Sequence, residues 1–168
     1  MPELLWSDVK DWFDPGTNGA LPDVCVSGTS VADWQAVLDL VRARGWACEY
    51  SVGGEVVALP DRAEDMLDRP GGLCVDLKVW PARGVLMIFR LYSPESVDFD
   101  VDLRELQGQQ RLDVFCGFLR TIGQALGKSV VMTPEASPDF PVLGYDVVAD
   151  RVALLAAWDG PSTGDGPA

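Results

Sequence analysis

The stretch VDFDVDLRELQGQQRLDVFCGFLRTIGQALG, residues 97–127, contains the two patterns that decide the fold. Its first seven residues alternate between apolar side chains and Asp98, Asp100 and Asp102, which is the period of a half-buried strand. From residue 109 to 126 apolar side chains recur at helical spacing, and Gly127 is typical of the position just beyond a helix. The stretch therefore predicts a strand with one acidic face, followed by a long amphipathic helix.

A similar order of elements is predicted earlier in the chain. A short apolar strand is expected at 23–26, and Ser30 is a suitable N-cap for a long helix that ends at Gly45. Two strands, 46–51 and 55–59, follow this helix and are joined by a glycine turn as a hairpin.

Further strands are predicted at 73–80, 85–92, 129–132 and 143–148. Strand, long helix and two strands thus occur in this order twice. We expect an α+β fold in which two long helices pack on one face of a mostly antiparallel sheet. The repeated order indicates either a duplicated β-α-β-β unit or the ordinary arrangement of α+β proteins.

The chain has 168 residues, of which 48% are hydrophobic, and this is enough for one domain with its own core. We expect a single α+β domain over 1–158, beginning with a short amphipathic helix at 2–13, and a disordered tail at 159–168. No apolar run approaches the roughly 20 residues of a membrane span, and the first residues lack the basic region of a signal peptide. No membrane association and a cytoplasmic location are therefore expected, and the preference for arginine over lysine suggests a bacterial source.

The charge is strongly asymmetric, with 26 acidic and 13 basic residues and a formal net charge of -13. Such a chain repels phosphates and attracts basic proteins, so we expect no nucleic-acid binding. The sequence has no histidine, which excludes Ser-His-Asp and Cys-His catalysis and every zinc site that uses histidine. A binding protein is therefore favoured over an enzyme, and no cofactor is predicted.

Four cysteines stand far apart at Cys25, Cys48, Cys74 and Cys116. They form no Cys-x-x-Cys pair, so no zinc site or redox pair is predicted. Each lies in an apolar stretch, and free cysteine is common in protein cores, so we expect four buried thiols.

The aspartates of the acidic strand are the densest charge cluster in the chain. Carboxylates at alternate strand positions lie about 6 to 7 Å apart and can ligate a hard cation such as magnesium. The calcium-loop pattern fails, because Leu103 stands where that loop requires glycine. The other interpretations are a solvated strand face, whose like charges discourage edge pairing, and a docking site for a basic partner.

Tryptophan is frequent, with six residues in the chain, and core packing explains most of them. Trp80 precedes a proline at a predicted hairpin, and an exposed tryptophan beside carboxylates is typical of a binding hot spot. The candidate partner-binding residues are therefore Asp98, Asp100, Asp102 and Trp80.

Three functional hypotheses follow. The first is a non-enzymatic acidic protein-binding module, an inhibitor or immunity-type protein that engages a basic partner, although no motif identifies a family. The alternative is a carboxylate-based hydrolase or transferase that depends on a divalent cation held by Asp98, Asp100 and Asp102. The third is a homo-oligomer that buries tryptophans between its copies.

Overall fold

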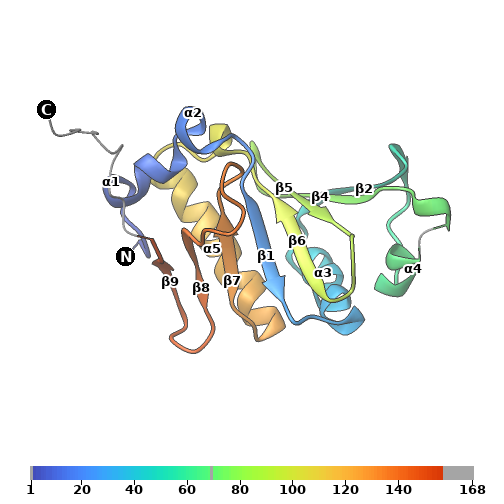
Figure 1. The fold of residues 1–168 in the computed structure, drawn as a ribbon. Helices are drawn as coiled ribbons and strands as arrows, with labels where there is room; N and C mark the ends of the chain where they lie inside the picture. Colours follow the sequence, from blue (N-terminus) through green and yellow to red (C-terminus); the bar gives the residue numbers. More distant parts are fainter. Residues whose placement is uncertain (1, 69, 157–168) are drawn as a thin grey trace, which may run out of the picture.

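The computed structural model describes residues 2–68 and 70–156, so the tail predicted at 159–168 lies outside the described residues. It contains one nine-stranded antiparallel sheet with the strand order β3-β2-β4-β5-β6-β1-β7-β8-β9 (Figure 1). The strands are β1 (Asp23–Ser27), β2 (Ala47–Val52), β3 (Glu55–Val57), β4 (Val75–Ala82), β5 (Val85–Arg90), β6 (Ser96–Asp100), β7 (Val130–Thr133), β8 (Leu143–Asp146) and β9 (Arg151–Leu154). The predicted α+β fold is confirmed.

Two long helices lie on the same face of the sheet, as predicted (Figure 1). The α-helices are α1 (Trp6–Val9), α2 (Pro15–Asn18), α3 (Val31–Arg44), α4 (Ala63–Leu67) and α5 (Gln109–Leu126), and short 3-10 helices are η1 (Lys10–Phe13), η2 (Pro70–Gly72) and η3 (Leu103–Glu105). No described helix is both long and apolar enough to cross a membrane.

The ends of α3 follow from local sequence. At its start the backbone N–H of Ser30 donates to the Asp33 carboxylate at 2.9 Å. This bond satisfies an N–H that has no backbone partner within the helix. At its end Gly45 has a φ of 64°, in the left-handed region, and its N–H bonds back to Arg42 and Val41. The predicted boundaries of this helix are confirmed.

The core lies between the two helices and the sheet. Phe118 of α5 packs against Phe89 of β5 and Phe99 of β6, with ring centroids 6.1 and 5.3 Å apart, and all three side chains are buried. Burying one such ring contributes about 3 kcal/mol of transfer free energy. This face of the sheet is thereby closed, and the opposite face remains open to solvent.

The repeated order of elements is present as β1-α3-β2-β3 and β6-α5-β7-β8. The two units are not equivalent in the sheet. Three strands lie between β1 and β2, whereas only β1 lies between β6 and β7.

The amino-terminal region differs from the single helix predicted at 2–13. It forms α1 and then η1, and α2 follows them. The Asp14 carboxylate accepts the N–H of Gly16 at 2.9 Å, and the Asn18 amide donates to the Asp11 carbonyl at 2.7 Å. These short-range polar contacts stabilise successive tight turns in place of a continuous helix.

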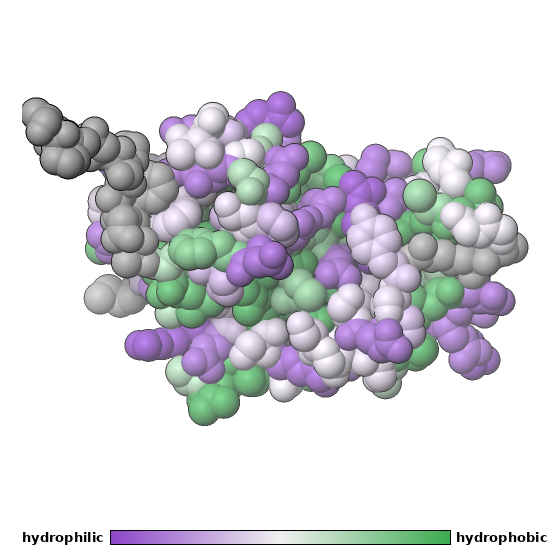
Figure 2. Space-filling model, viewed as in Figure 1, coloured by the Kyte–Doolittle hydropathy of each residue, from purple (hydrophilic) through white to green (hydrophobic). Residues whose placement is uncertain are grey.

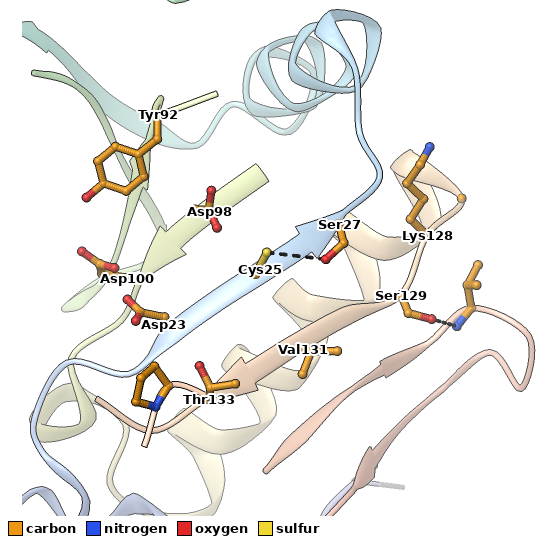
Figure 3. Close-up of a pocket in the computed structure, with 13 residues that line it drawn as sticks. Asp23, Cys25, Ser27, Tyr92, Asp98, Asp100, Lys128, Ser129, Val131 and Thr133 are labelled. Carbon is orange, nitrogen blue, oxygen red and sulfur yellow. Dashed lines mark hydrogen bonds between the residues drawn. The ribbon is translucent and has the colours of Figure 1, made fainter. Parts of the chain in front are cut away.

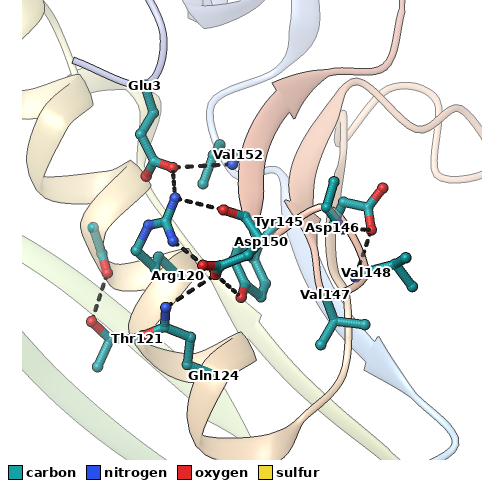
Figure 4. A network of polar contacts seen from close by, with 12 residues as sticks. Glu3, Arg120, Thr121, Gln124, Tyr145, Asp146, Val147, Val148, Asp150 and Val152 are labelled. Carbon is teal, nitrogen blue, oxygen red and sulfur yellow. Dashed lines mark hydrogen bonds and ion pairs between the residues drawn. The ribbon is translucent and has the colours of Figure 1, made fainter. Parts of the chain in front are cut away.

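A polar network fixes the amino-terminal segment against α5 and the β8–β9 turn (Figure 4). The Arg120 guanidinium pairs with Glu3 and, at 2.8 Å, with Asp150. The Tyr145 hydroxyl also donates to Asp150 at 2.5 Å, and the Val152 N–H donates to Glu3 at 3.2 Å. Asp150 has a φ of 50°, a strained conformation that these bonds hold in place.

The cysteines correct the expectation of four buried thiols. Only Cys116, on α5, is buried, and burial raises its pKa to about 12. Cys25 is half-buried, and Cys48 and Cys74 are exposed. Both exposed residues lie near the β3 edge, where the sheet ends, so an apolar sequence neighbourhood does not bury them.

Candidate functional site

A groove of about 920 Å³ lies on the open face of the sheet, across β6, β1 and β7 (Figure 3). The alternation of β1 accounts for its floor, because Val24 and Val26 are buried in the core while Asp23, Cys25 and Ser27 line the groove. The open face thus has a hollow at the centre of the sheet.

Strand pairing gathers three carboxylates in this groove. In the antiparallel register of β1 and β6, Asp23 lies opposite Asp100 and Cys25 lies opposite Asp98. All four side chains line the groove (Figure 3). The acidic side of the groove therefore comes from two strands that are far apart in the sequence.

Only one of these carboxylates has a cationic partner among the described residues. Arg90 of β5 donates through Nε to Asp100 at 2.9 Å and through a terminal nitrogen to Asp76 at 2.9 Å. No lysine or arginine nitrogen of the described chain lies within 4.0 Å of Asp23 or Asp98. Asp98 accepts a hydrogen bond from the Ser96 hydroxyl at 2.5 Å. Two carboxylates in the groove are thus left for an external cation.

Acidic side chains lie close together in the groove, and they change the pKa values of the groups beside them. Partial desolvation in the groove and the neighbouring carboxyl groups of Asp100 and Asp98 raise the pKa of Asp23 to about 6. Burial and the neighbouring Asp98 raise the pKa of the Cys25 thiol to about 11. Cys25 is therefore a neutral thiol near pH 7 and is not activated as a nucleophile.

The opposite side of the groove is less polar. Val131 and Thr133 extend from β7, and Pro138 and Val147 line the same side. Figure 2, viewed from this face, shows hydrophobic surface on the β7 and β8 side and hydrophilic residues toward the centre. Tyr92, just beyond β5, lines the rim and is 67% exposed. The groove therefore combines carboxylates, apolar surface and an aromatic ring, and its lining also includes one cationic residue, Lys128.

Two of the predicted site residues, Asp98 and Asp100, lie in this groove, and Asp102 does not. β6 ends at Asp100, two residues before Asp102. The Asp102 carboxylate accepts the backbone N–H of Arg104 at 2.9 Å and pairs with its guanidinium at 2.8 Å, which holds the pKa of Asp102 below its usual range. Asp102 thus caps the start of η3 and is already paired with a neighbouring cation.

Trp80 also lies outside the groove. It is within β4, opposite Ala47 of β2, and β5 separates β4 from β6. Its side chain is half-buried, and it is therefore less exposed than expected. The turn between β4 and β5 comes later, at Arg83 and Gly84, because β4 continues through Pro81 across an irregular register.

The geometry does not support the alternative of a divalent-cation site at the three aspartates. Asp102 turns away to Arg104, and Asp100 is already bound to Arg90. Within residues 2–68 and 70–156, no three acidic or cysteine side chains converge as metal ligands would.

Comparison of this chain with known protein families, curated proteins and solved structures finds no match. The function is therefore inferred from the groove itself. Sequence reasoning did not identify Asp23 or Tyr92 as site residues. Asp23, Cys25 and Ser27 alternate with two valines, and this pattern indicates that β1 has a polar face. It does not indicate that this face lies beside Asp98 of β6.

Proposed function

We propose that this protein is a non-enzymatic binding module whose groove holds a cationic segment of a basic protein partner, as an inhibitor or immunity-type protein would. One observation carries this proposal. Asp23 and Asp98 lie together in a groove of about 920 Å³, without a cationic partner from the described chain. The net charge of -13 supports it, because a strongly negative protein attracts basic partners over long range.

Arg90 is an internal example of the contact that we propose. Its guanidinium lies on the open face and bridges Asp76 and Asp100, with both nitrogen–oxygen distances at 2.9 Å. A planar guanidinium suits two carboxylates because its donors are fixed in a fork. An arginine of the partner would use Asp98 and Asp23 in the same way.

The remaining surface of the groove favours a peptide segment over a small ion. Val131, Pro138 and Val147 offer apolar contacts beside the carboxylates. Tyr92 offers an exposed ring at the rim, and arginine stacks well on aromatic faces. A segment with both cationic and apolar side chains would therefore contact both sides of the groove.

Calorimetric titration with an acetylated and amidated tetra-arginine peptide tests the proposal. We expect Asp98→Asn to weaken binding by about tenfold, because it removes one charge-assisted contact and keeps the side-chain shape. Asp8→Asn is the matched control, since it removes the same charge from the exposed surface of α1, outside the groove. Its expected effect is less than about twofold at moderate salt.

Equal weakening by the two substitutions would contradict the proposal, because binding would then depend on the net charge alone. The absence of measurable binding by the unaltered protein at low salt would contradict it as well.

A further inference from the structure

Two carboxylates face each other inside the groove. Asp23 and Asp100 are direct partners in the register of β1 and β6, and both side chains line the groove (Figure 3). Two ionised carboxylates in directly opposite positions repel each other, so the pair favours the state in which one of them holds a proton. The pair is thus a site where a proton is held.

The surrounding charges determine which member holds it. Arg90 donates to Asp100 at 2.9 Å, whereas no cation of the described chain is paired with Asp23. Asp76 accepts the other end of the same guanidinium. The proton therefore resides on Asp23, whose pKa is raised to about 6.

The groups facing Asp23 from the other elements favour the same state. Asp98 on β6 and Glu135, which follows β7, are both acidic and raise the pKa of Asp23. Cys25 on β1 has a pKa of about 11, and Tyr92 has a pKa above its usual value, so both are neutral near pH 7. Thr133, the β7 partner of Asp23, carries no charge.

One lysine, Lys128, also lines the groove. Lys128 stands at the other end of β7 from Thr133, and its ammonium pairs with Asp33 of α3 at 3.3 Å. Among the described residues, no ion pair of Lys128 with Asp23 is formed. The proton on Asp23 is thus not replaced by a cation of the described chain.

We propose that binding of a cationic side chain in the groove displaces the proton held by the Asp23–Asp100 pair, so that the partner binds more tightly as the pH rises. This inference rests on the proposed function of the groove. The carboxyl group of Asp23 loses its proton to solvent, and the resulting carboxylate pairs with the incoming ammonium or guanidinium. No other bond is made or broken.

The size of the effect follows from linkage. The pKa of Asp23 is about 6. Below this pH, each unit by which the pH falls lowers the affinity for the peptide by up to tenfold, and above it the affinity reaches a plateau. Between pH 5 and pH 7 the affinity should therefore rise about tenfold. At pH 6 about half a proton should be released for each peptide bound.

The experiment titrates the full chain with the tetra-arginine peptide at pH 5, 6 and 7, and at pH 6 in two buffers with different ionisation enthalpies. The number of protons released follows from the difference between the two heats. Asp23→Asn provides the comparison, because its amide has nearly the same shape, offers donors to Asp100 and cannot ionise. We expect this variant to bind more weakly at pH 7 and to lose most of the rise in affinity between pH 5 and pH 7. A carbon-detected NMR titration of the Asp23 carboxyl in the free protein gives a second measurement that needs no variant.

Titration of Asp23 near 6 together with proton release would support the inference. Peptide binding that is independent of pH, or an Asp23 carboxyl that titrates near 4, would overturn the coupling and leave the proposed function standing. Failure of the unaltered protein to bind the peptide at any pH would overturn the proposed function, and the coupling with it.

Discussion

Replacement of Asp23 by asparagine should change how the stability of the protein depends on pH. The pKa of Asp23 is raised from 3.8 to about 6 in the folded state, so the fold favours its protonated form. The associated stability is fully present below pH 3.8 and is lost as the pH rises through about 6. Asparagine cannot ionise and avoids this loss. The variant should therefore be more stable than the unaltered protein at pH 8, and this advantage should shrink at pH 5.

The magnitude can be worked from the shift. A pKa of about 6 in the folded state corresponds to about 1.4 kcal/mol between pH 5 and pH 8 if the whole shift acts on folding. Asp23 is exposed at the start of β1, so solvent screens part of this interaction. Asp23→Asn and the unaltered protein differ in their free energy of unfolding. We expect this difference to change between pH 5 and pH 8 by half of the full value, ~0.7 kcal/mol.

Urea denaturation followed by tryptophan fluorescence at pH 5 and pH 8 measures this change. Asp8→Asn reports the general effect of removing one negative charge outside the groove. The same pH dependence in Asp23→Asn and Asp8→Asn would refute the reasoning, since Asp23 would then behave as an ordinary surface carboxylate.

Two further predictions concern packing and thiol exposure. Gly123→Ala should destabilise the fold by about 3 kcal/mol in urea, because a methyl group there would overlap the Tyr145 ring, whereas Gly117→Ala meets nothing within 4 Å and should be neutral or stabilising by about 1 kcal/mol. Similar stabilities of the two variants would show that α5 does not pack so closely on β8. A thiol reagent should modify Cys48 and Cys74 in the folded protein and Cys116 only after unfolding. Rapid modification of Cys116 in the native state would contradict its burial.

Local patterns predicted most of the secondary structure. The helix expected at 109–126 is α5 with the same bounds, because apolar periodicity and Gly127 are properties of neighbouring residues. The acidic strand was predicted too long, since β6 ends at Asp100 and Asp102 caps the start of η3. An aspartate followed two residues later by an arginine is a local pattern that could have indicated this cap. The alternation of the preceding residues favoured a longer strand instead.

The candidate site was predicted only in part. Asp98 and Asp100 were identified from their alternation, but Asp23 joins them through the pairing of β1 with β6, between segments more than 70 residues apart. Strand order is set by packing of the whole sheet, so no local pattern contains it. The same limit applies to Trp80, which the strand order separates from the groove.

The central claim is that the groove across β6, β1 and β7 is a binding surface for a cationic segment. Mapping of backbone amide chemical shifts during titration with the tetra-arginine peptide at pH 7 tests it most directly. The largest shift changes should fall on Cys25, Asp98 and Val131 and their strand neighbours. Largest changes elsewhere, for example at Glu64 and Asp65 on α4, would contradict the claim.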